Sequence, residues 1–338
     1  MSRSRALVVS ALLIGQSGTT YAETPMSYWH TYGPAGYPLT QLGWGLGIIS
    51  IVVSAVIAVL LLGAMSHERS RAADDTQLAV GREGGGMGWI YIGTGITTVV
   101  LIGCMGWTLL TSASVVRPPS TPALTVQVTA SQWWWGLKYT SAEPSRTFIT
   151  ANEIHVPVGQ PVRFEVASAD VIHSFWVPQL GGKMDVIPGQ TNVTWLQADK
   201  PGVYRGQCAE FCGTEHARMA LVLIADTPED FRAWQDDQLR DTPIAASAQA
   251  RAGQRVFQAH CAVCHTIRGS DAAGIVGPDL SHLMTRRTLA AGLLANTPGN
   301  LAGWIADSQS LKPGASMPDH LVSGADLTAV VDYLKTLQ

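Results

Sequence analysis

Two long stretches without a charged residue constrain the fold of this chain most strongly: residues 42–65 and 84–116. A helix over the first stretch is about 36 Å long at about 1.5 Å per residue, which is enough to cross the hydrocarbon core of a bilayer. Buried helices of soluble domains rarely remain uncharged for so long. The two stretches therefore predict membrane-spanning helices at about residues 42–65 and 88–112.

The chain begins with the pattern of an export signal. A basic start, a short apolar run and small residues ending at Ala22 are typical of a cleaved signal peptide, which we place at residues 1–22. The link between the two apolar stretches carries three arginines, Arg69, Arg71 and Arg82. Because arginine-rich loops favour the cytoplasmic side, everything after residue 117 is predicted to lie outside, and residues 23–117 form the membrane anchor.

Two different patterns follow the anchor. Over residues 122–228, short alternating and β-branched runs are separated by Gly and Pro turns, which predicts an all-β sandwich or barrel. The runs expected to form strands are 124–129, 148–149, 153–158, 161–166, 193–196, 203–207 and 220–224. A short helix is expected over 227–239 and a linker over 240–248. Residues 246–338 are rich in helix formers broken by Gly and Pro loops, which predicts a separate all-α domain.

A cluster of soft metal ligands lies between two predicted strands. Cys208, Cys212, His216 and Met219 follow one another closely, and His173 precedes them. Thiolate, imidazole and thioether groups together suit copper, and two neighbouring thiolates can bridge a pair of copper ions that share one electron. A Cys208–Cys212 disulfide is the alternative in an oxidising compartment, but it leaves His216 and Met219 unexplained. Zinc is a further alternative, although it prefers additional Cys or His ligands to Met.

The all-α region contains a Cys-x-x-Cys-His motif formed by Cys261, Cys264 and His265. This motif attaches a c-type haem through its two thiols and presents the histidine to the iron. A thioredoxin-like redox pair is the other interpretation, but no alternating strand–helix pattern surrounds the motif.

A methionine is expected on the opposite side of the haem iron. Met317 lies in a Pro- and Gly-rich segment, and His/Met ligation raises the potential into the electron-transfer range. Met284 is the competing methionine, in a helix-like run that is typical of a core residue. His320 lies close enough to Met317 in sequence to remain a further candidate.

Four segments resemble cytochrome c oxidase subunit II. They are the run Gln-Trp-Trp-Trp at 132–135, residues 171–178, residues 183–189, and a loop with the pattern Cys-x-Glu-x-Cys-Gly-x-x-His-x-x-Met. With the two apolar stretches, the resemblance covers roughly residues 40–226. Residues 250–338 resemble a class I cytochrome c. The implied fold is a two-helix transmembrane hairpin, then an all-β cupredoxin-like Greek-key barrel, then an all-α class I cytochrome c domain.

The resemblance also implies roles for individual residues. The dinuclear copper centre, CuA, would take its ligands from six residues: His173, Cys208, Glu210, Cys212, His216 and Met219. In the family both cysteines bridge the two coppers, and the glutamate contributes its backbone carbonyl. The carboxylate of Glu210 is in addition a candidate ligand for a magnesium ion shared with subunit I.

The resemblance also bears on the roles of two further positions. Trp133 matches the aromatic residue through which electrons from cytochrome c enter the family's copper domain. Gln190 stands where the family usually has Arg after Pro-Gly, so the contact of that Arg with the haem propionates of subunit I is not carried over. The quinol-oxidising relatives have lost the copper ligands, whereas this chain keeps all of them.

The function implied is that of an electron-accepting oxidase subunit in a bacterial inner membrane. Cytochrome c or another periplasmic donor would reduce the covalently bound haem c, and electrons would continue through CuA to subunit I, which reduces oxygen and pumps protons. Subunits I and III and membrane lipid are the expected partners. The net charge of −3 gives no reason to expect binding to nucleic acid.

Two other functions deserve comparison. Nitrous-oxide reductases have a similar copper loop, but they carry a large His-rich propeller that this chain could not supply. A membrane-anchored periplasmic electron carrier serving a different terminal reductase, or acting without an oxidase, would have the same two centres. Small residues along the apolar stretches favour helix–helix packing with partner subunits, and co-purification would separate these alternatives.

Overall fold

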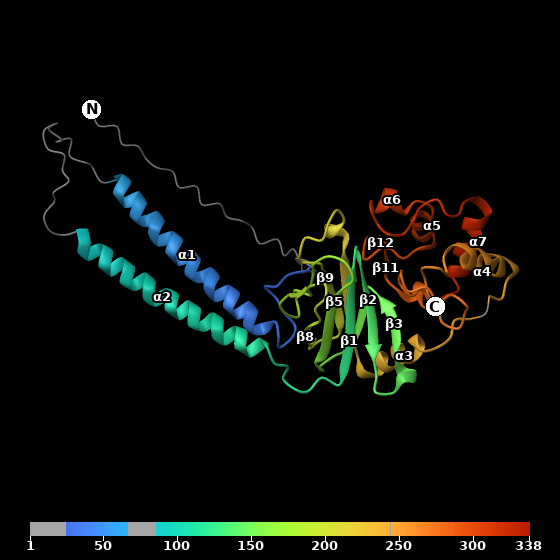
Figure 1. Ribbon diagram of the computed structural model, residues 1–338. Helices are drawn as coiled ribbons and strands as arrows, with labels where there is room; N and C mark the ends of the chain where they lie inside the picture. Colours follow the sequence, from blue (N-terminus) through green and yellow to red (C-terminus); the bar gives the residue numbers. More distant parts are fainter. Residues whose placement is uncertain (1–24, 67–85, 244) are drawn as a thin grey trace, which may run out of the picture.

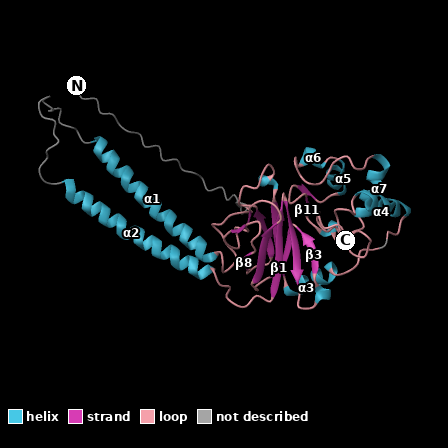
Figure 2. Cartoon of the chain, in the orientation of Figure 1, coloured by secondary structure: helices cyan, strands magenta, loops and turns pink. Residues whose placement is uncertain are grey.

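The computed structural model of the protein describes residues 25–66, 86–243 and 245–338. It has three parts in a row, namely a helical hairpin, a β domain and a helical domain (Figure 1). The strands of the main sheets lie in the middle part, with helices to either side (Figure 2). The predicted signal peptide at 1–22 and the arginines of the link between the apolar stretches lie outside the described residues.

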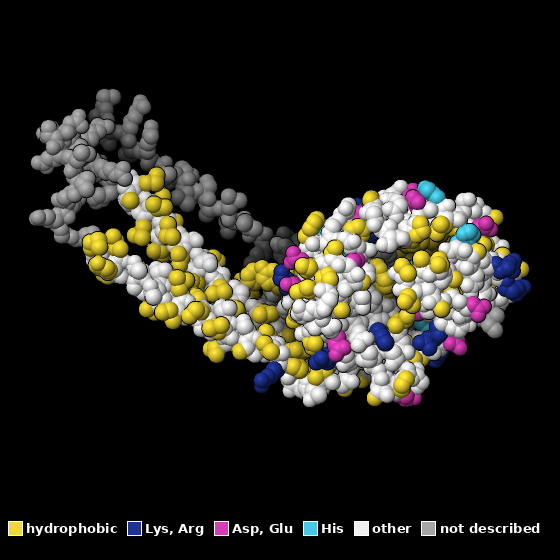
Figure 3. Space-filling model, viewed as in Figure 1, with side chains coloured by type: hydrophobic (Ala, Val, Ile, Leu, Met, Phe, Trp, Pro, Cys, Tyr) yellow, Lys and Arg dark blue, Asp and Glu magenta, His cyan; other side chains and the backbone are white. Residues whose placement is uncertain are grey.

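The hairpin consists of α1 (Tyr37–Ser66) and α2 (Gly86–Val115), both of which are long and apolar enough to cross a membrane. Their apolar side chains are largely exposed, and Figure 3 shows these side chains covering the visible face of the hairpin. The helices touch where Gly45 meets the ring of Trp107, since a Cβ atom on Gly45 would lie 2.1 Å from that ring. Small residues allow such close approach between membrane helices.

Two sheets and a short hairpin form the β domain. The larger sheet has the order β3-β2-β1-β5-β8, and its strands are β1 (Leu124–Ser131), β2 (Trp134–Thr140), β3 (Phe148–Ala151), β5 (Val162–Ser168) and β8 (Asn192–Leu196). The smaller sheet has the order β4-β10-β9, with β4 (Glu153–Pro157), β9 (Gly202–Gln207) and β10 (Ala220–Asp226). Strands β6 (His173–Phe175) and β7 (Met184–Val186) pair separately.

Alternation along the strands places the core of the β domain between its sheets. In β1, for example, Val126, Val128 and Ala130 are buried on one side, as the period of two requires. The parallel pairs β1·β5 and β4·β10 join strands that are distant in sequence, in keeping with the predicted cupredoxin-like topology. Strand β2 was not among the predicted strands.

One helix follows the last strand of the β domain, and the end of α2 contacts the domain on the membrane side. The helix predicted over 227–239 is present as α3 (Pro228–Gln238), and its N-cap is Thr227, whose hydroxyl accepts a hydrogen bond from the Asp230 N–H. On the membrane side, the Trp195 indole N–H donates to the carbonyl of Val115 at the end of α2, at 2.9 Å. The β domain is thereby fixed at the outer end of the hairpin.

The helical domain contains α4 (Ala248–His260), α5 (Pro298–Ala306), α6 (Ser308–Leu311) and α7 (Gly324–Leu334), with a small hairpin of β11 (Thr288–Leu289) and β12 (Leu294–Ala295). Helices α4 and α7 cross at Gly253, where an added Cβ atom would lie only 1.8 Å from the carbonyl oxygen of Ala329. The crossing buries Phe257 against Tyr333, with the rings edge to face at 5.8 Å. Short 3₁₀ turns lie at Pro144–Arg146, His216–Arg218 and Leu283–Thr285.

Candidate functional site

The predicted copper ligands come from the ends of three strands. His173 is the first residue of β6, Cys208 follows β9, and Met219 precedes β10. The Cys208 N–H donates to the Met219 carbonyl at 3.0 Å and closes the loop on itself. The next N–H, of Ala209, donates to the Ser174 carbonyl at 3.0 Å and ties the loop to β6. Backbone hydrogen bonds thus bring the upstream histidine to a loop that is distant in sequence.

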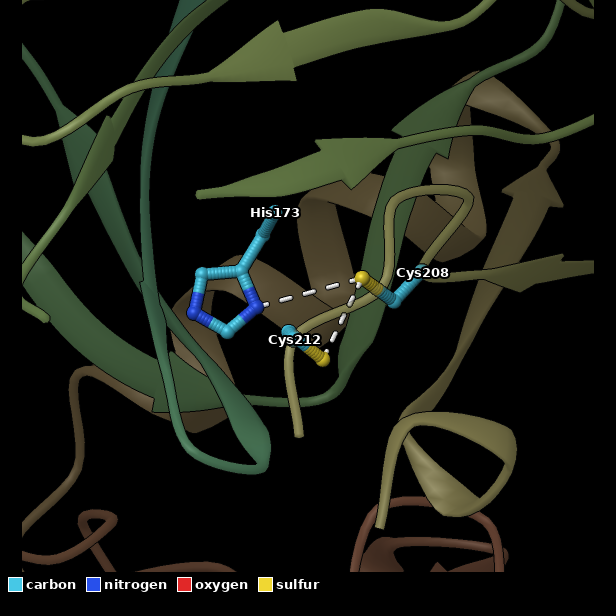
Figure 4. Close-up of side chains that lie close together, drawn as sticks. All are labelled: His173, Cys208 and Cys212. Atoms are coloured by element: carbon cyan, nitrogen blue, oxygen red, sulfur yellow. Dashed lines mark hydrogen bonds between the residues drawn. The ribbon is translucent and has the colours of Figure 1, made fainter. Parts of the chain in front are cut away.

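Sulfur and nitrogen atoms of these residues gather around one point. The Sγ atoms of Cys208 and Cys212 are 3.7 Å apart, and Cys208 Sγ lies 3.8 Å from His173 Nδ1 (Figure 4). Cys212 Sγ lies 3.6 Å from His216 Nδ1 and 3.8 Å from Met219 Sδ. A disulfide needs about 2.05 Å between its sulfurs, and none of the chain's cysteines is in one. The arrangement therefore disagrees with the disulfide alternative.

The donor set fits a pair of copper ions. The backbone carbonyl of Glu210 lies 3.2 Å from Cys208 Sγ, so all six predicted ligand groups are close to one or other cysteine. His173, Cys208, Cys212 and Met219 are buried, which keeps water from these soft ligands. The metal-binding clusters among the described residues do not include the Glu210 carboxylate, and its magnesium role stays a prediction.

The two thiols titrate as a pair. The contact between their sulfurs lowers the pKa of Cys208 and raises the pKa of Cys212. One proton is therefore shared by the pair before a metal binds. That proton must leave when both sulfurs become thiolate ligands.

Asp170 orients the upstream histidine. Its Oδ1 lies 2.7 Å from His173 Nε2, which leaves Nδ1 facing Cys208. Burial alone would raise the pKa of Asp170, but hydrogen bonds from His173 and from the backbone N–H groups of Gln132 and Val171 lower it overall. A carboxylate on the outer nitrogen of a ligating histidine fixes the ring and increases its basicity. The sequence prediction missed Asp170, whose position three residues before the histidine was the available signal.

Trp133 lies against the copper loop. Its indole Nε1 donates to the Cys212 carbonyl at 3.1 Å, and the Gln132 side chain donates to the same oxygen at 2.7 Å. The ring is only 7% exposed. Gly314 of the helical domain lies beside it, since an added Cβ atom there would be 3.3 Å from the ring. Trp133, which is predicted to receive electrons from a donor, is thus covered by the helical domain of the same chain.

The Cys-x-x-Cys-His motif lies at the end of α4. His265 Nδ1 hydrogen-bonds to the Pro278 carbonyl at 2.8 Å, which leaves Nε2 available to an iron ion. Burial lowers the pKa of His265 and keeps the imidazole neutral, as a ligand must be. Gly277 lies against this ring, because a Cβ atom at Gly277 would be 2.6 Å from His265 Cε1. With both thiols free, these residues fit a covalently attached haem.

The two candidate methionines differ in how the chain holds them. Met317 lies on a loop, and its carbonyl accepts hydrogen bonds from Ser308 Oγ and Gln309 Nε2, both at 2.8 Å. Met284 lies in a 3₁₀ turn, and both methionines pack partly buried against the core of the helical domain. The side chain of the third candidate, His320, is 74% exposed. Assignment of Met317 as axial ligand stays a prediction.

Gln190 lies on the exposed side of the β domain. Its side-chain amide donates to Asn192 Oδ1 at 2.5 Å, and Asn192 in turn donates to the Asp185 carbonyl at 2.7 Å. The glutamine is therefore part of a local turn network within the β domain.

A hairpin with two candidate membrane spans, a β domain with a copper-type cysteine loop and a helical domain with a haem-attachment motif define a membrane-anchored electron-transfer protein. Comparison with known proteins agrees. The family model for the periplasmic domain of cytochrome c oxidase subunit II matches residues 141–225, and the model for cytochrome c matches residues 250–338.

Whole-chain relatives carry the same name. The cytochrome c oxidase subunit 2 of Alkalihalophilus pseudofirmus is 33% identical over 297 residues, which cover 87% of this chain and 84% of the relative. That of Bacillus subtilis is 31% identical over 227 residues, or 64% of this chain and 63% of the relative. The chain belongs to the cytochrome c oxidase subunit II family and carries a cytochrome c domain.

A solved structure is also similar in sequence. The periplasmic domain of subunit II of cytochrome oxidase of Bradyrhizobium japonicum is 34% identical, covers 35% of this chain and 95% of its own, and superimposes with a TM-score of 0.33. As a member of the family, this chain is a component of an oxidoreductase complex. It is a membrane-anchored subunit with a periplasmic domain. The two matching family models imply copper and haem.

Proposed function

We propose that this chain relays single electrons from a periplasmic donor to the oxygen-reducing subunit of a haem–copper oxidase. The observation that carries the proposal is the group of four ligand atoms around the two cysteine sulfurs, which are 3.7 Å apart. When bound, the copper pair and the haem each take up and release one electron without changing their ligands.

On the copper side, the chain supplies a preformed and buried set of ligands. His173, Cys208, Glu210 through its carbonyl, Cys212, His216 and Met219 would hold the two ions. Asp170 fixes the His173 ring, and the hydrogen bonds of the loop backbone hold the cysteines in place. A rigid and water-free site keeps the reorganisation that accompanies electron transfer small.

On the haem side, Cys261 and Cys264 would form the covalent attachment, with His265 and Met317 as axial ligands. The hydrogen bond to Pro278 orients His265, and Ser308 and Gln309 hold the Met317 backbone. Filled axial positions leave no open site for oxygen, so oxygen reduction belongs to a partner subunit.

Both centres would lie on one side of a membrane. We assign residues 23–117 to an anchor that crosses the bacterial inner membrane twice, 122–228 to the CuA domain and 246–338 to the cytochrome c domain. Subunits I and III and membrane lipid would surround α1 and α2, whose apolar faces are exposed. Cytochrome c or another periplasmic protein would deliver electrons to the helical domain.

Spectroscopy of the full-length chain, purified in detergent with copper and haem quantified, tests the proposal. The expected result is two coppers and one low-spin c-type haem per chain, with a seven-line mixed-valence copper signal in electron paramagnetic resonance. A single copper ion, or a Cys208–Cys212 disulfide in place of copper, would contradict the relay. Co-purification of a haem–copper subunit I distinguishes an oxidase subunit from a carrier that serves another reductase.

A further inference from the structure

Lys312 is the most deeply buried lysine side chain among the described residues, and it lies between the two outer domains. It follows α6 in the helical domain and is 2% exposed. Its Nζ donates to the backbone carbonyls of Trp133 at 2.8 Å, Arg218 at 2.9 Å and Ala290 at 2.9 Å. An ammonium group has three N–H donors, so these three carbonyls satisfy it completely. Two of the three belong to the β domain, and the lysine is fully paired only when the domains are docked.

The carbonyls that receive Lys312 flank the copper loop. Arg218 immediately precedes the ligand Met219, and Trp133 hydrogen-bonds to the carbonyl of Cys212. Two residues beyond the lysine, Gly314 adopts a φ of +83° and packs against the Trp133 ring, where a side chain would not fit without displacing one or the other. The same loop continues to Met317. Lys312 therefore holds the Met317 segment on the tryptophan that touches the copper loop.

The turn that contributes the third carbonyl is strained. Ala290 and Ala291 have φ values of 52° and 60°, a left-handed conformation that non-glycine residues rarely adopt. The Ala290 carbonyl accepts from Lys312, and the Ala291 carbonyl accepts from the Ala220 N–H of the β domain at 3.1 Å. Strained backbone of this kind persists where surrounding contacts hold it. Here the hydrogen bonds to the Ala290 and Ala291 carbonyls are two such contacts, and both lie at the boundary between the domains.

A second buried group fixes the relative orientation of the domains. Glu153 of β4 is 4% exposed, and its Oε1 accepts hydrogen bonds from the N–H groups of Arg287 at 2.7 Å and Thr288 at 3.1 Å. Arg218 also donates to the Leu311 carbonyl at 3.0 Å. Contacts at several separate places define one docked arrangement, in which the β11–β12 hairpin faces the β domain (Figure 1).

We propose that Lys312 is a positioning residue that locks the helical domain onto the Trp133 face of the β domain, so that Trp133 is an internal contact between the two redox centres and not a docking surface for a soluble donor. This inference rests on the proposed function for its electron-transfer consequence. With both groups bound, the step would move one electron from the reduced haem to the oxidised copper pair, with no bond made or broken and no proton moved. An external donor would then dock on the helical domain.

The test compares the full-length protein with the variants K312M, K312Q and K335M. K312M keeps the length of the side chain but leaves three buried carbonyls without their donor, whereas K312Q retains one amide donor group. K335M is the matched control, because Lys335 directly follows α7 and its Nζ pairs with Asp332 of that helix at 3.1 Å. Copper and haem content and spectra are recorded first for every protein.

Two readouts then follow. Hydrogen exchange of the peptides that contain Trp133 and Gly314 reports docking without requiring electron transfer. Laser-flash reduction of the haem, followed by the rate of copper reduction, reports the consequence. We expect exchange at these peptides to accelerate by about ten-fold or more in K312M, since each buried acceptor left unpaired shifts the opening equilibrium by about that factor. Copper reduction should slow in K312M in proportion to the loss of the docked population, with K312Q intermediate and K335M unchanged.

Equal exchange and equal electron-transfer rates in K312M and K335M would overturn the proposal. Should both Lys312 variants fail to fold, hydroxyl-radical labelling of the unmodified protein decides: Trp133 is expected to be protected, and labelling at the rate of an exposed tryptophan would contradict the docked arrangement. Loss of the proposed function is distinguishable, because the unmodified protein would then lack its copper or haem signal while hydrogen exchange still reports the interface.

Discussion

The indole N–H of Trp133 and the side-chain amide of Gln132 both donate to the carbonyl oxygen of Cys212, at 3.1 Å and 2.7 Å. Cys212 provides one of the two sulfurs of the candidate copper centre. The tryptophan ring is thus one hydrogen bond away from the residue that would supply a metal ligand. Its opposite contact is Gly314, on the loop that carries the candidate haem ligand Met317.

Substitution W133F should slow internal electron transfer while leaving the copper centre assembled. Phenylalanine lacks the N–H donor, but Gln132 still pairs with the Cys212 carbonyl, so we expect a loss of stability of only about 1 kcal/mol. Thermal unfolding and the copper signal measure assembly, and flash reduction measures transfer. W134F, in the neighbouring half-buried tryptophan, serves as the control. A W133F protein with unchanged transfer would show that this ring is not on the route.

Asp170 should matter for copper affinity. In D170N the carboxylate that orients His173 becomes an amide, and loss of such a partner typically weakens metal binding about 10- to 100-fold. Competitive titration with a copper chelator measures the affinity. D185N, whose carboxylate is exposed on β7, should bind copper as the unmodified protein does. The role of Asp170 would be refuted by equal affinities in D170N and D185N.

The axial methionine can be identified by substitution. M317A should open one coordination position, so that the reduced haem binds carbon monoxide nearly completely and the oxidised haem loses its iron–sulfur charge-transfer band. M284L replaces the competing methionine with a residue of similar volume, at an expected cost of less than about 1.5 kcal/mol, and should leave the haem spectrum unchanged. The opposite pattern would assign Met284 as the ligand.

Glu153 should make the stability of the outer domains depend on pH. Burial raises the pKa of its carboxyl group, and this effect is only partly offset by the N–H groups of Arg287 and Thr288 and by the nearby Arg286 and His155. The folded chain therefore holds the proton more tightly than the unfolded chain, whose ordinary value is 4.5. The stability this proton provides is complete below that value and is lost as pH rises through the raised pKa.

The matched measurement is the melting temperature of the unmodified protein and of E153Q at pH 5 and pH 8. Because glutamine cannot titrate, E153Q should gain stability relative to the unmodified protein on going from pH 5 to pH 8. E165Q, which changes a carboxylate whose contacts with Gln127 and Arg163 lie within the β domain, is the control for removal of a carboxylate elsewhere. A constant difference between E153Q and the unmodified protein would contradict the sign of the shift.

Strand β2 is an element that the local sequence pattern does not predict. Trp134–Thr140 contains Gly136 and Lys138, which are weak strand formers, and its first residues belong to the tryptophan run. It forms a strand because β1 and β3 pair with it on both sides. Local propensity describes the residues of a strand alone and does not include the stabilisation that its two pairing partners provide.

The sequence by itself determined the apolar helical hairpin, the change from β to helical structure and the set of candidate metal-binding groups. These three features depend on composition, periodicity and side-chain chemistry. Such properties can be recognised in short segments, for example in the loop from Cys208 to Met219. Only the tertiary structure decided how the two outer domains meet. Lys312 binds backbone carbonyls of Trp133, Arg218 and Ala290, and backbone atoms are the same in every residue. An interface made through them leaves no pattern in the sequence, because its specificity comes from where the folded chain places those carbonyls.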